Sequence, residues 1–154
     1  MTGNEARPMT DYTWTTLEDA VLAALKAQLG ARVKTLETYQ GDLLADLKRE
    51  AWRLPAVLVM LRQSRAEAVT ASSYDVHLDF TVLAAARQLR GETAGRRQEG
   101  GVYDILEGVR QALWHQDLGL EILPFSLVLE EPLLTTREFT VYAAHYRTGA
   151  VRDL

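Results

Sequence analysis

The run "PAVLVMLRQ" (residues 55–63) constrains the fold most, because both of its alternating sets of side chains are apolar. Side chains of a β-strand point alternately to the two faces of the sheet. A strand with one solvated face would carry polar residues at every second position, and this run does not. It therefore predicts a central strand covered on both sides. Pro55 stands at the first position, where it costs no interior hydrogen bond.

The segment "YDVHLDFTVLAAAR" (74–87) predicts a second strand with clear alternation. Apolar side chains from Tyr74 onward share one face, whereas Asp75, His77 and Asp79 share the other. The polar stretch "SRAEAVTASS" before it indicates a loop. Together the two strands predict a sheet that has one packed face and one partly polar face.

The remaining elements follow from helical spacing and from strand alternation. "TWTTLEDAVLAALKAQLG" predicts a helix with Thr16 as its cap and Gly30 as its end. Residues 43–54 predict a short helix, and "GVYDILEGVRQALWHQ" predicts a longer one. Residues 32–39, "FSLVLEE" and "EFTVYAAHYR" predict three more strands, of which the last two form a hairpin.

The predicted order of elements is therefore α-β-α-β-β-α-β-β. This order favours an α+β fold, in which a mixed, mostly antiparallel sheet carries its helices packed on one face. A chain of 154 residues suits one domain, because two would each have a thin core. We expect an N-terminal tail at residues 1–13, one α+β domain at 14–148 and a C-terminal tail at 149–154.

The charge and the absence of cysteine narrow the classes of function. With a net charge of -4, the whole molecule is not an electrostatic nucleic-acid binder, so any anion site must be local. The sequence has no cysteine for disulfides, thiolate nucleophiles or cysteine metal sites. No segment resembles a signal peptide or supplies the roughly 20 apolar residues of a membrane helix. We expect a soluble cytoplasmic protein with no membrane partner.

A basic, glycine-rich loop, "AARQLRGETAGRRQEGG", separates the second strand from the longer helix. It lacks the patterns G-x-x-x-x-G-K-[ST] and G-x-G-x-x-G, and it has no aromatic side chain on which a base could stack. Its arginines are Arg87, Arg90, Arg96 and Arg97. We expect an exposed loop whose arginines either only keep it soluble or contact another protein, for which a guanidinium is suited because it pairs bidentately with carboxylates.

The best candidate for metal or acid–base chemistry is Asp75-x-His77-x-Asp79. Strand geometry places next neighbours of this set about 7 Å apart on one face, as ligands of Zn or Mn would be. The same pattern is ordinary for a strand with a solvated face. No G-x-S-x-G nucleophile elbow is present. We expect no catalytic residue, no cofactor and no metal, and we keep a metal-dependent hydrolase as an alternative.

Three stretches, taken in order, resemble the tail terminator family of Mu-type, contractile-tailed phages and prophages. The first is "LEDAVLAALKAQLG" followed by "VKTLETYQGDL", and the second is "LPAVLVML". The third is "GVYDILEGVRQALWHQDLGLEILPFSLVLEEPLL", which ends in "FTVYAAHYRT". Together they span almost the whole chain after residue 13.

The resemblance implies a structural protein without an active site. Subunits of this family form a ring, commonly a hexamer, on the last ring of the tail tube. The ring stops polymerisation of the tube and presents a surface to the head. The implied partners are copies of the chain itself, the tail tube protein, and the sheath and head-tail connector proteins, with DNA only in transit through the lumen. The implied location is the bacterial host cytoplasm during assembly and then the virion tail.

The polar sheet face is the expected subunit interface, with Thr140, Tyr142 and Tyr146 beside the aspartates and His77. Tyrosines suit an interface because the aromatic part of the side chain is apolar and its hydroxyl group is polar. Besides the hydrolase, two other functions stay open. One is a head–tail adaptor or stopper, which would also form a ring. The other is a monomeric nucleic-acid binder acting through the arginine loop.

Overall fold

The computed structural model describes residues 13–49, 51–88, 96–97 and 101–153. Its first helix, α1 (Trp14–Leu29), buries Leu17, Val21 and Leu25, which follow one another at helical spacing. The predicted cap at Thr16 is wrong. The cap is Thr13, whose extended backbone lets its side chain accept a hydrogen bond from the Thr16 backbone nitrogen at 3.1 Å. The helix ends before Gly30, as expected.

The described strands form one five-stranded sheet in the order β1-β2-β3-β5-β4. Their bounds are Thr35–Thr38 for β1, Ala56–Ala68 for β2, Ser73–Arg87 for β3, Ser126–Thr135 for β4 and Phe139–Asp153 for β5. β1 and β2 are parallel, and every other neighbouring pair is antiparallel. The α+β class, the mixed sheet and the predicted order of elements are confirmed.

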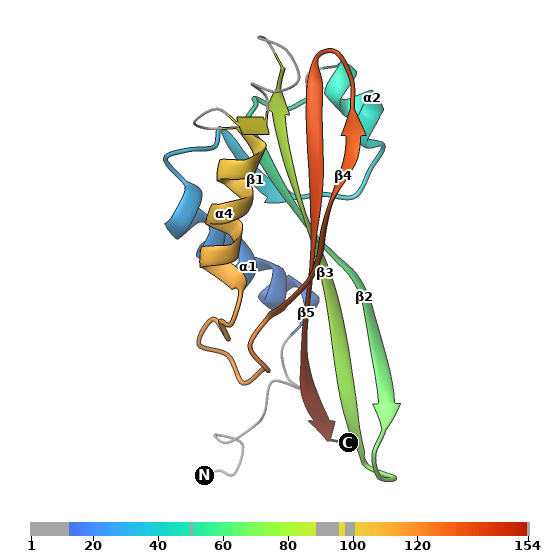
Figure 1. Cartoon of the computed structure of the whole chain (residues 1–154). Helices are drawn as coiled ribbons and strands as arrows, with labels where there is room; N and C mark the ends of the chain where they lie inside the picture. The colour runs from blue at the N-terminus through green and yellow to red at the C-terminus, as the bar shows by residue number, and fades with distance from the viewer. Residues whose placement is uncertain (1–12, 50, 89–95, 98–100, 154) are drawn as a thin grey trace.

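The two long helices, α1 and α4 (Val102–Leu113), cover one face of the sheet, which we call the inner face (Figure 1). The short helix α2 (Leu43–Lys48) lies against one end of the opposite, outer face through Leu47. The prediction that the helices pack on one face of the sheet is therefore correct for α1 and α4, whereas α2 packs on the other face. In β2, Val57 and Val59 face inward and Ala56 and Leu58 face outward, and all are buried. The prediction of a strand covered on both sides is confirmed.

The sheet extends beyond the helices as a three-stranded arm, defined here as residues 62–68 of β2, 73–79 of β3 and 147–153 of β5 (Figure 1). The predicted loop at 64–73 is wrong in its first half, because residues 64–68 pair with β3. Likewise, residues 149–153 are not a tail but the end of β5. Cross-strand pairing keeps these polar residues extended: Arg65 lies opposite His77, which in turn lies opposite Gly149.

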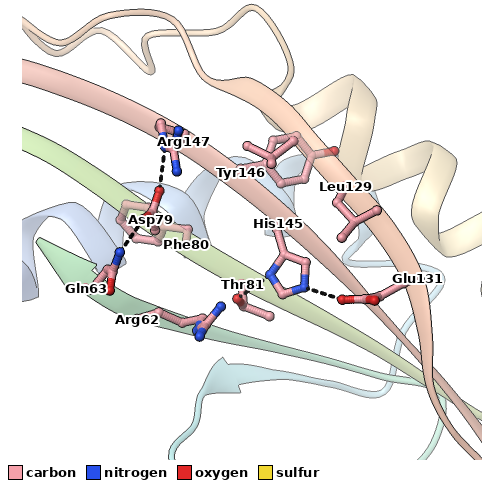
Figure 2. Close-up of a pocket in the computed structure, with 11 residues that line it drawn as sticks. Arg62, Gln63, Asp79, Phe80, Thr81, Leu129, Glu131, His145, Tyr146 and Arg147 are labelled. Atoms are coloured by element: carbon pink, nitrogen blue, oxygen red, sulfur yellow. Dashed lines mark hydrogen bonds and ion pairs between the residues drawn. The ribbon is translucent and has the colours of Figure 1, made fainter.

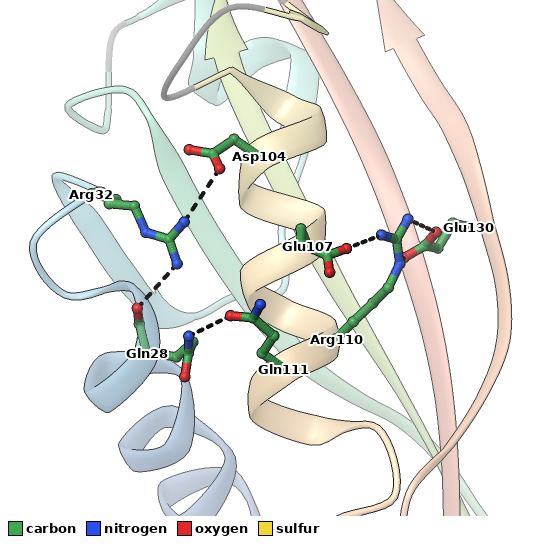
Figure 3. A network of polar contacts seen from close by, with 7 residues as sticks. All are labelled: Gln28, Arg32, Asp104, Glu107, Arg110, Gln111 and Glu130. Carbon is green, nitrogen blue, oxygen red and sulfur yellow. Dashed lines mark hydrogen bonds and ion pairs between the residues drawn. The ribbon is translucent and has the colours of Figure 1, made fainter.

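Helix α4 approaches α1 closely at Gly108. A Cβ atom at this position would lie 2.3 Å from Leu29 Cδ2, so only glycine fits without a shift. Polar contacts add to this packing: Gln28 of α1 donates to Gln111 of α4 at 2.6 Å, and Arg32, just after the end of α1, pairs with Asp104 of α4 at 3.3 Å (Figure 3). The glycine and these contacts therefore set the spacing of the helical layer above the inner face.

Arg110 joins the helical layer to the edge of the sheet (Figure 3). Its Nε and Nη2 atoms donate to the two carboxylate oxygens of Glu130 on β4 at 2.9 and 2.7 Å, and Nη1 donates to Glu107 at 2.6 Å. These bonds to two carboxylates raise the pKa of Arg110 above its ordinary value, against the opposing effect of burial. A bidentate pair of this kind also fixes geometry, so it holds β4 in a defined position relative to α4.

Candidate functional site

The outer face of the sheet beyond α2 carries the polar side chains that the alternation of β3 predicts. Asp75, His77 and Asp79 all lie on this face, since each precedes the buried outer residue Leu83 by an even number of residues. Their neighbours differ, however. His77 Nε2 is 3.7 Å from Glu67 Oε1 on β2, whereas Asp79 pairs with groups nearer the middle of the sheet.

Asp79 is held by donors from both adjacent strands (Figure 2). Arg147 Nε donates to Asp79 Oδ1 at 2.8 Å, and Gln63 Nε2 donates to Oδ2 at 2.9 Å. Burial by itself opposes ionisation of Asp79, but the hydrogen bonds from Arg147 and Gln63 outweigh it, and the pKa of Asp79 lies below its ordinary value. The carboxylate therefore stays charged and ties β2, β3 and β5 together.

A second chain of contacts lies beside it, centred on His145 (Figure 2). Thr81 Oγ1 is 2.9 Å from His145 Nδ1, and His145 Nε2 is 3.1 Å from Glu131 Oε2. Between the two groups lies a hollow of about 350 Å³, lined also by Arg62 and Leu129. Its polar groups are engaged mainly with one another, which orders this part of the surface.

The metal-site hypothesis finds no support in this geometry. Asp79 is engaged by a guanidinium and an amide, and His77 turns toward Glu67. Within the ranges that the structure describes, no three histidine, aspartate or glutamate side chains are grouped so as to hold a metal ion. Asp75, His77 and Asp79 therefore share a face without converging on one point.

The expected tyrosine interface is wrong. Tyr146 and Thr140 are buried on the inner face, and Tyr142 packs there in a half-buried position. The outward set of β5 instead continues from Val141 and Ala143 to His145 and Arg147. The two sets of side chains on β5 are similarly apolar along most of the strand, so alternation alone does not show which set faces the helices.

The edge strand β4 presents an apolar strip that the sequence analysis did not identify. Val128, Leu129 and Leu133 are 54%, 47% and 52% exposed. β4 is the last strand of the described sheet, and its pairing with β5 shifts register between Leu127 and Leu129. The run "SLVLEEPLL" contains the signal, but an apolar run in a strand ordinarily marks the core. These three side chains form an exposed apolar strip on the edge strand.

Comparison with known families identifies the chain. The model of the family described as Bacteriophage Mu, Gp37 matches residues 13–150. The chain belongs to the Mu Gp37 family. It is thus a phage structural protein of the Mu type. No curated protein matches the chain. No described helix of this Gp37-family protein is long and apolar enough to cross a membrane.

The four arginines of the glycine-rich loop are placed only in part. Arg87 ends β3 and lies with its guanidinium carbon 5.5 Å from the centre of the Phe139 ring, a cation–π contact. Arg96 is half-buried and Arg97 exposed in a short helical stretch. Arg90 lies outside the described residues. Contact of these arginines with another protein stays a prediction for this member of the Gp37 family.

Proposed function

We propose that this protein is a tail terminator: a subunit of a homo-oligomeric ring, expected to be a hexamer, that caps the tail tube and stops its polymerisation. Family membership over residues 13–150 is the observation that carries the proposal. The ring would present its other surface to the head-tail connector. In this scheme the chain acts by binding and not by catalysis, in the host cytoplasm during assembly and then in the virion tail.

The surface of the chain supports this proposal. The outer sheet face holds ordered charged groups, such as Asp79 with Arg147, beside the exposed apolar strip of β4. An apolar centre with a polar surround is the usual anatomy of a protein interface. The partners we propose are further copies of this chain, the tail tube protein and, on the completed tail, the sheath and connector proteins.

Tube assembly provides the test of this function. Purified tube protein is polymerised with and without the chain, and tube lengths are measured by negative-stain microscopy. A terminator added at far below one copy per tube subunit shortens the tubes and appears as density at one end. Light scattering after size exclusion measures the ring. A connector ring that does not bind the tube would leave the lengths unchanged, and that result would refute the terminator proposal.

The arginine loop has its own test within this proposal. Arg96→Glu combined with Arg97→Glu should weaken ring formation or capping while the circular dichroism spectrum stays unchanged. The matched control reverses two exposed arginines elsewhere, Arg53 and Arg137. If the loop variant assembles and caps as well as the control, the loop has no role in contact.

A further inference from the structure

The sheet has two free edges, one on each side. β1 pairs with β2 only from Ala56 to Val59, so on that side residues 60–68 of β2 have no neighbouring strand within the described chain. On the other side of the sheet, the edge of β4 (Ser126–Thr135) that points away from β5 is likewise unpaired among the described strands. At about 3.3 Å per residue, each edge is about 30 Å long. Because the sheet has a free edge on each side, it can be continued from one copy to the next.

The direction of the strands suits this continuation. β2 is antiparallel to β3, β3 to β5, and β5 to β4, so β2 and β4 of one copy run in opposite directions. If copies are arranged head to tail, β2 of one copy therefore lies antiparallel to β4 of the next. Antiparallel pairing is the more stable ladder per residue. A contact between two different surfaces of the same chain also generates a ring when its rotation closes.

Charge on the two edges is complementary. Arg62 and Arg65 are exposed on β2, and neither makes an ion pair or side-chain hydrogen bond with any residue that the structure describes. On β4, Glu131 faces the same outer surface, with 46% of its side chain exposed beside His145. A continued sheet would bring the arginines of one copy and the glutamate of the next to the same face. It would also cover the apolar residues Val128 and Leu129.

The edges are unsuited to indiscriminate pairing. Pro132 has no backbone N–H to donate, and the ladder of β4 shifts register on either side of residues 129–132. Pro132 and the shift after it limit pairing along β4 to residues 126–131, and the shift at Val128 gives this segment an irregular shape that a partner strand has to match. The charged residues on β2 similarly oppose pairing with an edge of like charge. The irregular shape of β4 and the charges on β2 therefore favour pairing with one particular edge over pairing with any exposed strand.

We infer that residues 62–68 of β2 in one copy pair antiparallel with residues 126–131 of β4 in the next copy, so that the sheet continues around the ring. This inference rests on the proposed ring and specifies its subunit contact, the paired β2 and β4 edges, which we call the joint. The partner is a second copy of this chain. Arg62 and Arg65 meet Glu131 across the joint, and Val128 and Leu129 become buried there.

Cysteine cross-linking tests the joint, because the natural chain has no cysteine. Glu67→Cys and Ser126→Cys lie at exposed positions on the two edges and on the same, outer face, since Glu67 is opposite Asp75 and Ser126 is opposite Arg147. We expect neither variant to form a disulfide dimer alone, whereas an oxidised mixture gives the heterodimer. The double variant should give a ladder of covalent species that ends at the ring size. Ala23→Cys, on the exposed face of α1, replaces either partner as the control and should give no dimer.

The outcomes separate the joint from the function. Rings that cap tubes without the mixed cross-link overturn the joint and leave the terminator proposal intact. Self-linking of either single variant indicates a two-fold contact and also overturns the joint. A mixed cross-link in a protein that does not cap tubes keeps the joint and refutes the terminator role. If neither rings nor cross-links form, in solution or on tube ends, both proposals fail.

A charge exchange provides a second test that does not depend on oxidation. Arg62→Glu with Arg65→Glu should raise the concentration needed for half-assembly by about tenfold or more, and adding Glu131→Arg should restore most of this loss. The Arg53→Glu, Arg137→Glu control should assemble like the natural chain. Circular dichroism establishes that each variant folds. Loss of assembly without any restoration by the third change contradicts the pairing of these charges.

Discussion

The buried hydroxyl of Tyr146 leads to a prediction of unusual sign: Tyr146→Phe should stabilise the protein. The side chain is 1% exposed, and its hydroxyl oxygen has no hydrogen-bond partner among the residues that the structure describes. Burial, assisted by the carboxylate of Glu130, raises the pKa of Tyr146 above its ordinary value, so the phenol stays neutral. The hydroxyl therefore carries a desolvation cost without a compensating bond.

The expected size of the effect follows from two opposing terms. An unpaired buried hydroxyl costs about 1–3 kcal/mol. Its removal leaves a void of roughly 15 Å³, which costs about 0.4 kcal/mol at about 24 cal/mol per Å³. The first term is larger, so Tyr146→Phe should raise the free energy of unfolding by about 1 kcal/mol. For a chain of this size, this corresponds to a rise in Tm of roughly 2–4 °C.

Urea unfolding, followed by circular dichroism under conditions in which the chain is monomeric, measures this difference. The matched control is Tyr146→Leu, which removes the ring as well and should destabilise by about 2 kcal/mol through lost packing. The slope of unfolding free energy against urea should stay unchanged in the phenylalanine variant. If Tyr146→Phe instead lowers stability by 1 kcal/mol or more, the hydroxyl is hydrogen-bonded in solution and the reasoning is wrong.

Two further predictions concern the packing of the helices and the outer face. Gly108→Val should lower the free energy of unfolding, measured by urea titration, by about 2 kcal/mol. The reason is that overpacking against Leu29 outweighs a gain in helix propensity of under about 1 kcal/mol. A variant as stable as the natural chain would contradict the close approach of α4 to α1. Because the pKa of Asp79 is lowered in the folded state from 3.8, its stabilisation is complete above that pH and declines as pH falls below it. The difference in unfolding free energy between the natural chain and Asp79→Asn, measured by urea titration, should therefore shrink from about pH 7 to about pH 3. A difference that stays constant would contradict the lowered pKa of Asp79.

Local patterns in the sequence were sufficient for the class of fold and the order of its elements. Residues 56–61 predict a strand buried on both faces, because alternation assigns every side chain to one of two faces without any long-range information. The same rule places Asp75, His77 and Asp79 on one face. It does not show whether they meet, because that depends on the neighbouring strands: His77 turns to Glu67 on β2, and Asp79 pairs with Arg147 on β5, which is distant in sequence.

What the sequence by itself determined, then, was periodicity: which residues alternate, which follow a helical repeat, and where turns interrupt them. Only the tertiary structure decided which side of β5 faces α4, and hence that Tyr146 is buried while His145 is not. It also decided that residues 64–68 and 149–153 are strands, since polar segments such as these are held extended by pairing with β3. Side and pairing depend on contacts between segments far apart in the chain, and a local pattern contains no information about those contacts.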